Sequence, residues 1–256
     1  MKLYALHCGG EEVDLCEFDP FDPRRGTKVT SPFFAYLIDH PRGTVLFDTG
    51  ANRSFAGDPA QRYGALAAGF AIQMTEADHV VARMAQLGFK PEDVDWVVLS
   101  HLHYDHAGNL EDFPSSKVLV QTAELVFAHW PPVYQRATFL PKDFAFDANW
   151  IEVDGDYDVF GDGRLVTFPT PGHTPGHQSM LVQLDGKVLI LVGDAAYQPE
   201  QMAARRLPAL VWSPDAMVAS WQKIEAWQRK YNAELLLTHD LGFAGKTRVA
   251  PGEWYE

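Results

Sequence analysis

The hydrophobic pattern of the first 50 residues predicts β-strands separated by turns. Leu3–Leu6 is a short apolar run, and Phe33–Ile38 and Thr44–Phe47 flank the turn residues at 39–43. Runs of this length that are rich in aromatic and β-branched residues are typical of strands. The second and third runs therefore predict a hairpin. The stretch 11–30, rich in Asp, Pro, Gly and Arg, predicts a long loop instead.

Two segments show the spacing of a helix. Thr75–Asp78 resembles a capping box with Asp in place of Glu, and apolar residues follow at helical spacing until Gly88. Ser213–Asp215 opens the clearest helix of the chain, with an N-cap residue, a proline at the first helical position and an acid in the first turn. Its buried side is predicted to consist of Met217, Trp221 and Ile224.

The rest of the chain after residue 88 is dominated by strands. A short helix is expected over Thr122–Ala128, and the Pro- and aromatic-rich stretch 130–149 is expected to be irregular. The predicted strands are Val94–Ser100, Lys117–Val120, Trp150–Val153, Tyr157–Phe160, Arg164–Phe168, Ser179–Leu184, Lys187–Val192 and Glu234–Thr238.

A cluster of histidines follows the strand at 94–100. The string His101-Leu102-His103-Tyr104-Asp105-His106 reads as the loop that leaves this strand. In extended backbone, residues two apart point the same way, so His101 and His103 can face one ion together. After a turn, Asp105 and His106 can face a second ion. Imidazole and carboxylate groups are common ligands of transition metals, so the string predicts a metal site.

Three more strands end in potential ligands. The strands before His173, Asp194 and His239 each deliver one of these residues at their carboxyl end. Four strand ends with the same chemistry predict one common site. The other histidines lie in no such context, and we interpret His177 as an imidazole that fixes its turn rather than as a ligand. The surface or packing histidines are His7, His40, His79 and His129.

Asp48-Thr49-Gly50, at the end of the predicted hairpin, has a second interpretation. The same triplet occurs in aspartic proteases, but those enzymes need two such carboxylates, and the chain has no second D-T-G or D-S-G. We therefore interpret Asp48 as a residue that supports a ligand or fixes its loop. Phe18 and Phe21, in the predicted loop at 11–30, either anchor that loop or form a lip over a pocket.

Composition and charge exclude several classes of partner. The chain has 21 basic and 34 acidic residues, a formal net charge of −13, which disfavours nucleic acid and anionic membrane surfaces as partners. No stretch approaches the ~18 apolar residues of a membrane span. Cys8 and Cys16 form no C-x-x-C motif, and the N-terminal apolar run is too short for a signal peptide, so we expect a cytoplasmic protein. The length of 256 residues allows one large domain or two small ones.

The motifs resemble those of the metallo-β-lactamase superfamily. The H-x-H-x-D-H string, the D-T-G after an early hairpin, and T-P-G-H-T-P-G-H at 170–177 all look like its signatures. The resemblance covers nearly the whole chain and implies one domain over residues 1–256, an α/β fold of the αββα sandwich type with two mixed sheets flanked by helices. True β-lactamases typically carry a Cys where Asp194 stands here, which argues against that activity.

Within the superfamily, the chain looks most like the N-acyl homoserine lactonases, which open the lactone ring of bacterial quorum-sensing signals. The stretches that carry this likeness are Met74–Glu76, His101–Gly108, Pro171–Ser179, Asp194–Tyr197 and Thr238–Asp240. The stretches up to Thr30 and at 130–149 match less well. We expect both of them to border the substrate pocket.

The resemblance implies a ligand set and a cofactor. His101, His103 and His173 would hold one divalent ion; Asp105, His106 and His239 would hold another; and Asp194 would bridge them. Zinc suits these ligands, although iron, manganese and cobalt do as well. Seven ligands leave open positions on two ions, which favours catalysis over a purely structural metal protein or a signal-binding module.

The resemblance also implies a mechanism. Two ions ~3.5–4 Å apart would share a water, lower its pKa towards ~7, and so provide a bridging hydroxide that attacks the lactone carbonyl. Tyr197 would donate a hydrogen bond to the developing oxyanion, and Asp105 would pass a proton to the leaving alkoxide. An ester, a thioester or an organophosphate is the alternative substrate class. Phe18, Phe21, Phe70 and Ile72 are the candidates for an acyl-chain wall, and the resemblance allows a homodimer that no sequence feature demands.

Overall fold

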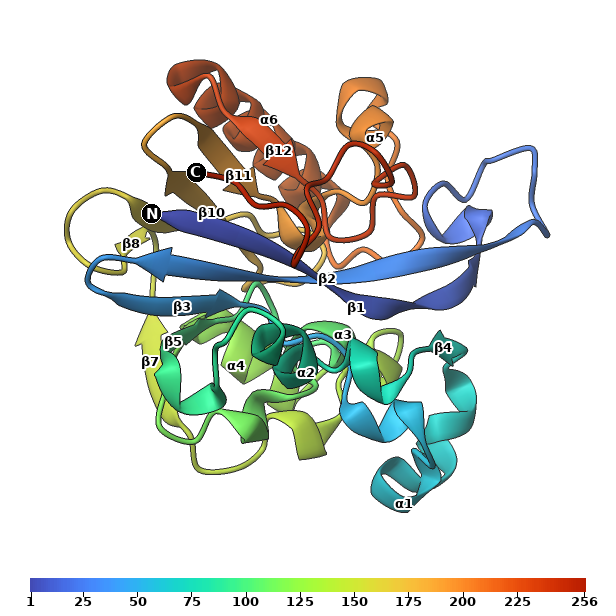
Figure 1. Ribbon diagram of the computed structural model, residues 1–256. Helices are drawn as coiled ribbons and strands as arrows, with labels where there is room; N and C mark the ends of the chain where they lie inside the picture. The colour runs from blue at the N-terminus through green and yellow to red at the C-terminus, as the bar shows by residue number, and fades with distance from the viewer.

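Two β-sheets packed face to face form the centre of the protein, and helices cover their outer faces (Figure 1). The structure is a computed structural model that describes residues 1–256. The first sheet has seven strands in the order β4-β1-β2-β3-β5-β6-β7, and the second has five in the order β12-β11-β10-β9-β8.

The strands of the first sheet are β1 (Lys2–Asp14), β2 (Lys28–His40), β3 (Gly43–Phe47), β4 (Ile72–Gln73), β5 (Val94–Val98), β6 (Lys117–Gln121) and β7 (Asn149–Val153). Those of the second are β8 (Tyr157–Asp158), β9 (Leu165–Pro169), β10 (Gln178–Gln183), β11 (Val188–Leu191) and β12 (Glu234–Leu236). The helices are α1 (Ala60–Tyr63), α2 (Val80–Ala85), α3 (Tyr104–Ala107), α4 (Thr122–His129), α5 (Pro199–Ala204) and α6 (Pro214–Tyr231). None of them combines the length and apolar character that a membrane crossing requires.

Strands buried on both faces explain the continuous apolar runs of the sequence. Successive side chains on a strand point to opposite faces. On β2, Phe34 therefore packs between the sheets, whereas Phe33 packs on the outer face with Val80 and Met84 of α2. On the second sheet, α6 covers the outer face through Trp221 and its neighbours. The αββα sandwich expected from the sequence is confirmed.

The predicted hairpin at 33–47 is confirmed, but the prediction of a loop over 11–30 is wrong at both ends. β2 and β3 pair antiparallel across Pro41 and Arg42. β1 continues to Asp14 and pairs with the start of β2, with Glu11 opposite Ser31 and Asp14 opposite Lys28. The paired ends carry polar side chains, so no apolar alternation marks them as strands. The paired ends of β1 and β2 form a two-stranded ribbon that is extended by backbone pairing alone. Figure 1 shows this ribbon reaching past the second sheet.

The strand ends predicted to share a site lie at one edge of the sandwich. β9 and β11 each pair antiparallel with β10, and β12 pairs parallel with β11, so all three have their carboxyl ends at the same edge. The end of β5, from the other sheet, meets them there. One detail differs from the prediction: only His101–His103 form a loop, because Tyr104–Ala107 fold into the single helical turn α3.

Trp221 couples α6 to the turn that carries Asp194. Its ring is fully buried and its Nε1–H donates to the carbonyl of Ala195. We expect Trp221→Phe to lower the free energy of unfolding by about 1–3 kcal/mol, because it leaves a buried carbonyl without a partner. Urea denaturation measures this change. Trp254→Phe, at a ring that is 37% exposed, serves as the control and should stay within about 0.5 kcal/mol of the parent protein.

Candidate metal centre

The structure brings together all seven residues that the sequence proposed as ligands. They form three overlapping groups whose potential ligand atoms lie within 4.8 Å of one another. None of the seven residues is more than 8% exposed. The groups are His101–His103–His173, His101–His106–Asp194 and Asp105–His106–His239.

Asp194 lies between two sets of imidazole nitrogens. Its Oδ2 is 3.4 Å from His173 Nε2 and 3.9 Å from His101 Nε2. Its Oδ1 is 3.1 Å from His239 Nε2 and 3.2 Å from His106 Nε2. Each carboxylate oxygen thus faces a different set of histidines, which is the position that a ligand shared by two ions requires.

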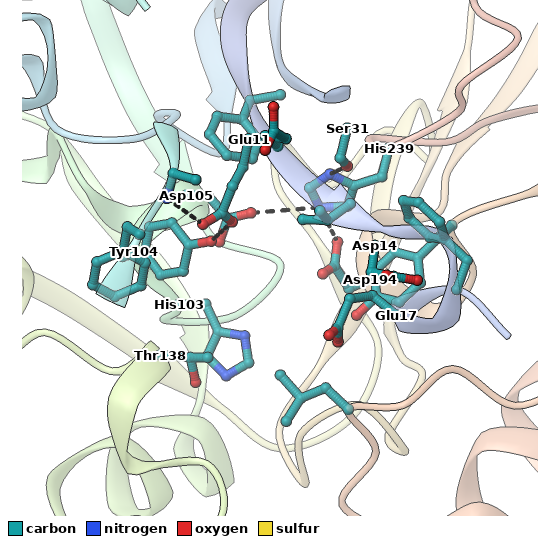
Figure 2. A pocket seen from close by; sticks show the side chains of 18 of the residues that line it. Glu11, Asp14, Glu17, Ser31, His103, Tyr104, Asp105, Thr138, Asp194 and His239 are labelled. Carbon is teal, nitrogen blue, oxygen red and sulfur yellow. Dashed lines mark hydrogen bonds and ion pairs between the residues drawn. The ribbon is translucent and has the colours of Figure 1, made fainter. Parts of the chain in front are cut away.

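The remaining members complete the two sets. His103 Nδ1 lies 2.9 Å from His173 Nε2, so these two histidines and His101 point at one place. Asp105 Oδ2 lies 3.5 Å from His239 Nε2 and 3.6 Å from His106 Nε2 and joins the second set. Figure 2 shows Asp105, Asp194 and His239 pointing toward one another at the floor of a cleft.

Oxygen atoms behind the histidines fix which ring nitrogen faces the centre. His239 Nδ1 donates to the carbonyl of Pro32 at 2.9 Å, and His173 Nδ1 donates to that of Leu210 at 3.2 Å. His106 Nδ1 is 2.9 Å from Asp48 Oδ2, and His101 Nδ1 is 3.0 Å from the Ser100 hydroxyl. Each of these four rings therefore directs its Nε2 lone pair inward, as metal-binding histidines do when their other nitrogen is held.

Several buried polar atoms at the centre have no hydrogen-bond partner. They include Nε2 of His101, Nε2 of His106 and Oδ1 of Asp194. Leaving such an atom unpaired costs about 1–3 kcal/mol, so the site is incomplete as a purely protein structure. Five imidazoles and two carboxylates are the donor set that divalent transition metals prefer. The residues fit two divalent metal ions.

Burial and charge act differently on the two sets of imidazoles. Burial lowers the pKa of His101 well below its usual value and lowers that of His173 to about 4, which keeps both rings neutral. Burial also opposes the charged forms of His106 and His239, but the carboxylates of Asp194 and Asp105 outweigh it and raise both pKa values. A divalent cation would take the place of these protons.

Asp48, Ser100 and His177 support the centre without belonging to the three groups. Asp48 accepts hydrogen bonds from the backbone N–H and the hydroxyl of Ser100 at 2.7 and 2.8 Å, in agreement with its interpretation as a supporting residue. His177 accepts from the backbone N–H of Asp194 at 2.9 Å through Nε2, and its Nδ1 donates to the carbonyl of Thr170. Burial lowers the pKa of His177 to about 3, so the ring stays neutral as this arrangement needs. Ser100 was missed, because a lone serine before a histidine carries no signal of its own.

A cleft of about 500 Å³ opens above the centre (Figure 2). Two of the four residues proposed for an acyl-chain wall, Phe18 and Phe70, line it. Phe21 does not line the cleft, because it is 91% exposed in the connection between β1 and β2. Ile72 does not line it either and packs against the apolar core on the outer face of the first sheet. The stretches 11–30 and 130–149 both border the cleft, as expected. The lining residues that the sequence did not predict include Val13, Phe33, Tyr104, Thr138 and Leu210.

Tyr104 and Tyr197 bring hydroxyl groups to this cleft. Tyr104 follows His103 directly, and its hydroxyl donates to Glu11 of β1, whose other oxygen accepts from the backbone of Ala71. Tyr197 lies against Phe18, and its hydroxyl oxygen is 3.1 Å from His173 Nδ1. Burial and the nearby carboxylates raise the pKa of Tyr197 well above 10, so its O–H remains a donor at neutral pH.

Comparison with known proteins defines the class of this fold and site. Residues 33–239 match the family model of the metallo-beta-lactamase superfamily, and the chain belongs to that superfamily. Along its whole length, it is 36% identical to N-acyl homoserine lactonase AttM of Rhizobium radiobacter, with 98% of that protein covered. It is 29% identical to N-acyl homoserine lactonase AiiA of Bacillus thuringiensis subsp. kurstaki, with 98% of this chain and 97% of that protein covered.

Solved structures show the same likeness. An N-acyl homoserine lactone hydrolase with the product N-hexanoyl-L-homoserine bound at its catalytic metal centre superposes with a TM-score of 0.86 at 27% identity, with 99% of this chain and 98% of that one covered. AidC, a dizinc quorum-quenching lactonase, superposes with a TM-score of 0.71 at 18% identity, with 99% and 93% covered, and shows the fold alone.

Replacing His177 tests whether it is a support or a ligand. We expect His177→Gln to retain two metal ions per chain after gel filtration, because the hydrogen bonds of this ring go to the Asp194 N–H and to Thr170 and not to the proposed ligand atoms. His173→Gln should retain fewer metal ions per chain. Inductively coupled plasma mass spectrometry measures both contents. Loss of one full equivalent from His177→Gln would contradict the interpretation of this ring as a support.

Proposed function

We propose that this protein is a dinuclear metal-dependent hydrolase that opens the lactone ring of N-acyl homoserine lactones. The observation that carries the proposal is the placement of Asp194, whose two oxygens each face a separate set of histidines at the floor of the cleft. Full-length similarity to proteins named as N-acyl homoserine lactonases supports the choice of substrate.

The reaction adds one water to the lactone carbonyl carbon and breaks the bond from that carbon to the ring oxygen. Two divalent ions bound here would supply Lewis acidity, which lowers the pKa of water and polarises a carbonyl. The ring oxygen leaves and takes up a proton, and the new carboxyl group loses one at neutral pH. The net result is N-acyl homoserine and one proton released.

Two side chains of the cleft would act on the reacting atoms. Tyr197 keeps its proton, so its hydroxyl would donate a hydrogen bond to the carbonyl oxygen as negative charge develops there. Asp105 lines the cleft and lies beside His106 and His239. A carboxylate in this position is placed to take up the proton of the attacking water and to pass it to the leaving ring oxygen.

The acyl chain would lie along the apolar part of the cleft. Phe18 packs against Tyr197, and Phe33 and Phe70 pack against Tyr104. Leu210 lines the same cleft. The ring centroids of Phe70 and Tyr104 are 4.3 Å apart. Aromatic and aliphatic walls of this kind bury hydrocarbon from water, which favours a fatty-acyl substituent.

We propose zinc as the metal, since the set of imidazole and carboxylate donors suits it, with iron, manganese and cobalt as alternatives for metal analysis to decide. Because the ligands come from both sheets, we propose that residues 1–256 act as one domain. Both cysteines are unpaired, which supports the proposal of a cytoplasmic protein. A homodimer stays a prediction, which analytical ultracentrifugation tests.

Proton release from zinc-loaded protein tests the proposed reaction. With N-hexanoyl and N-decanoyl homoserine lactone in a weakly buffered indicator solution, we expect one proton per lactone opened. Asp194→Ala should reduce the rate to the uncatalysed level, and removal of metal by a chelator should do the same until zinc is returned. If two zinc ions are bound per chain and neither lactone is opened, the proposed substrate is wrong.

Tyr197→Phe tests the hydrogen-bond donor. Loss of one such donor to an oxyanion typically lowers kcat by about 10²–10³-fold. We expect this loss with little change in KM, because the ring and its packing on Phe18 are kept. Tyr63→Phe, which removes another buried hydroxyl that donates to Asp143 away from the cleft, is the control. Equal kcat values for the two variants would exclude the proposed role of Tyr197.

A further inference from the structure

Glu124 is a fully buried carboxylate beside the metal centre that the proposed mechanism does not use. It lies in the first turn of α4, with no exposed surface. Its Oε1 accepts a hydrogen bond from the backbone N–H of Leu102 at 3.0 Å. Its Oε2 accepts from the Thr174 hydroxyl at 2.6 Å and from the backbone N–H of Gly176 at 3.2 Å.

These three donors come from the two loops that carry the first set of histidines. Leu102 lies between His101 and His103 in the sequence, and Thr174 follows His173 directly. One carboxylate therefore joins the backbone of the loop after β5 to that of the loop after β9. The two loops come from different sheets, so their relative position is not set by strand pairing.

The contacts require a carboxylate rather than an amide. All three partners donate hydrogen bonds, and an ionised carboxylate is an acceptor only. A glutamine in the same place would direct its NH₂ group at one of these N–H or O–H donors. The fit is also close in space, because a Cβ atom added at Gly176 would lie 2.1 Å from the backbone nitrogen of Glu124.

The cost of burying this group indicates that it serves more than packing. Burial raises the pKa of Glu124 to about 7, although the hydrogen bonds from Thr174, Leu102 and Gly176 lower it. Burying an ionisable group that has no counter-charge costs free energy, which packing alone does not repay. A carboxylate held by donors from two ligand-bearing loops is instead suited to fix the geometry of the ligands.

We propose that Glu124 is a positioning residue for the ion bound by His101, His103 and His173. By joining the two loops that carry these histidines, it fixes their relative positions. This inference rests on the proposed metal centre. The ion held by Asp105, His106 and His239 depends on it less. Glu124 contacts the loop at Leu102, whereas Asp105 and His106 belong to the helical turn α3, and His239 has its own partner in Pro32.

Zinc affinity measured by competition with a chromophoric chelator tests the proposal without any lactone. We expect Glu124→Gln to bind one of its two zinc ions about 10–100-fold more weakly, the range typical for loss of a group that orients metal ligands. The other ion should be held as in the parent protein. Thr174→Val removes one donor and should weaken the same ion to a smaller extent, whereas Thr174→Ser restores the hydroxyl and should restore the affinity.

Asp143→Asn is the matched control. Asp143 is a buried carboxylate as well, but it accepts from Arg62 and Tyr63 and contacts none of the proposed ligands. Its replacement should leave both zinc affinities unchanged. Thermal unfolding of the metal-free variants shows how much each replacement affects the fold alone.

The outcomes separate this inference from the proposed function. If Glu124→Gln and Thr174→Val lower the stability of the metal-free protein but leave both zinc affinities unchanged, Glu124 is merely structural and the inference is overturned. If Asp143→Asn lowers the zinc affinity as much as Glu124→Gln does, the inference is overturned too. A parent protein that binds zinc but opens no lactone contradicts only the substrate, whereas one that binds no zinc contradicts the metal centre itself.

Discussion

The rest of this structure depends on holding the seven side chains proposed as metal ligands together out of water. Imidazoles and carboxylates converge at one edge of the sandwich, and several of their inward-facing atoms lack a hydrogen-bond partner. Such a cluster is unfavourable by itself, so it persists only where the surrounding fold is rigid or a cation completes it. The apolar cores between and outside the two sheets supply that rigidity, since the strands that deliver the ligands are buried on both faces.

Support for the ligands is arranged in layers around the centre. Asp48 binds both the backbone of Ser100 and His106, so the end of β3 orients a ligand that follows β5. His177 receives the N–H of Asp194, and Trp221 of α6 binds the carbonyl of the next residue. His106 and Asp194 are thus held by residues that are distant in the sequence. A small displacement of a sheet or helix would therefore move the side chains proposed as metal ligands.

The cleft combines this floor with walls that come from other parts of the chain. The ribbon formed by β1 and β2 carries Glu11 and Phe33 to one side of the opening, and the segment at 130–149 contributes Thr138. The motifs that resemble those of the lactonases lie mainly at the floor, whereas the stretches up to Thr30 and at 130–149 resemble them less. Chemistry at the floor and selection of the acyl group at the walls are therefore set by different parts of the chain, as is common for sites built on a stable scaffold.

The sequence by itself determined the sandwich, the hairpin at 33–47 and the seven residues that meet at the centre. The sandwich is implied by the resemblance of the motifs to the metallo-β-lactamase superfamily, whereas the hairpin and the seven residues follow from local rules, because turn residues and polar groups at strand ends are visible within short windows. Only the tertiary structure decided the rest. Pairing between chain segments extended β1 to Asp14, turned Phe21 to solvent and placed Phe33 in the cleft. Glu124 looks like an ordinary acid in a first helical turn until packing brings Leu102 and Thr174 to its carboxylate. Contacts of this kind join residues that no local pattern relates.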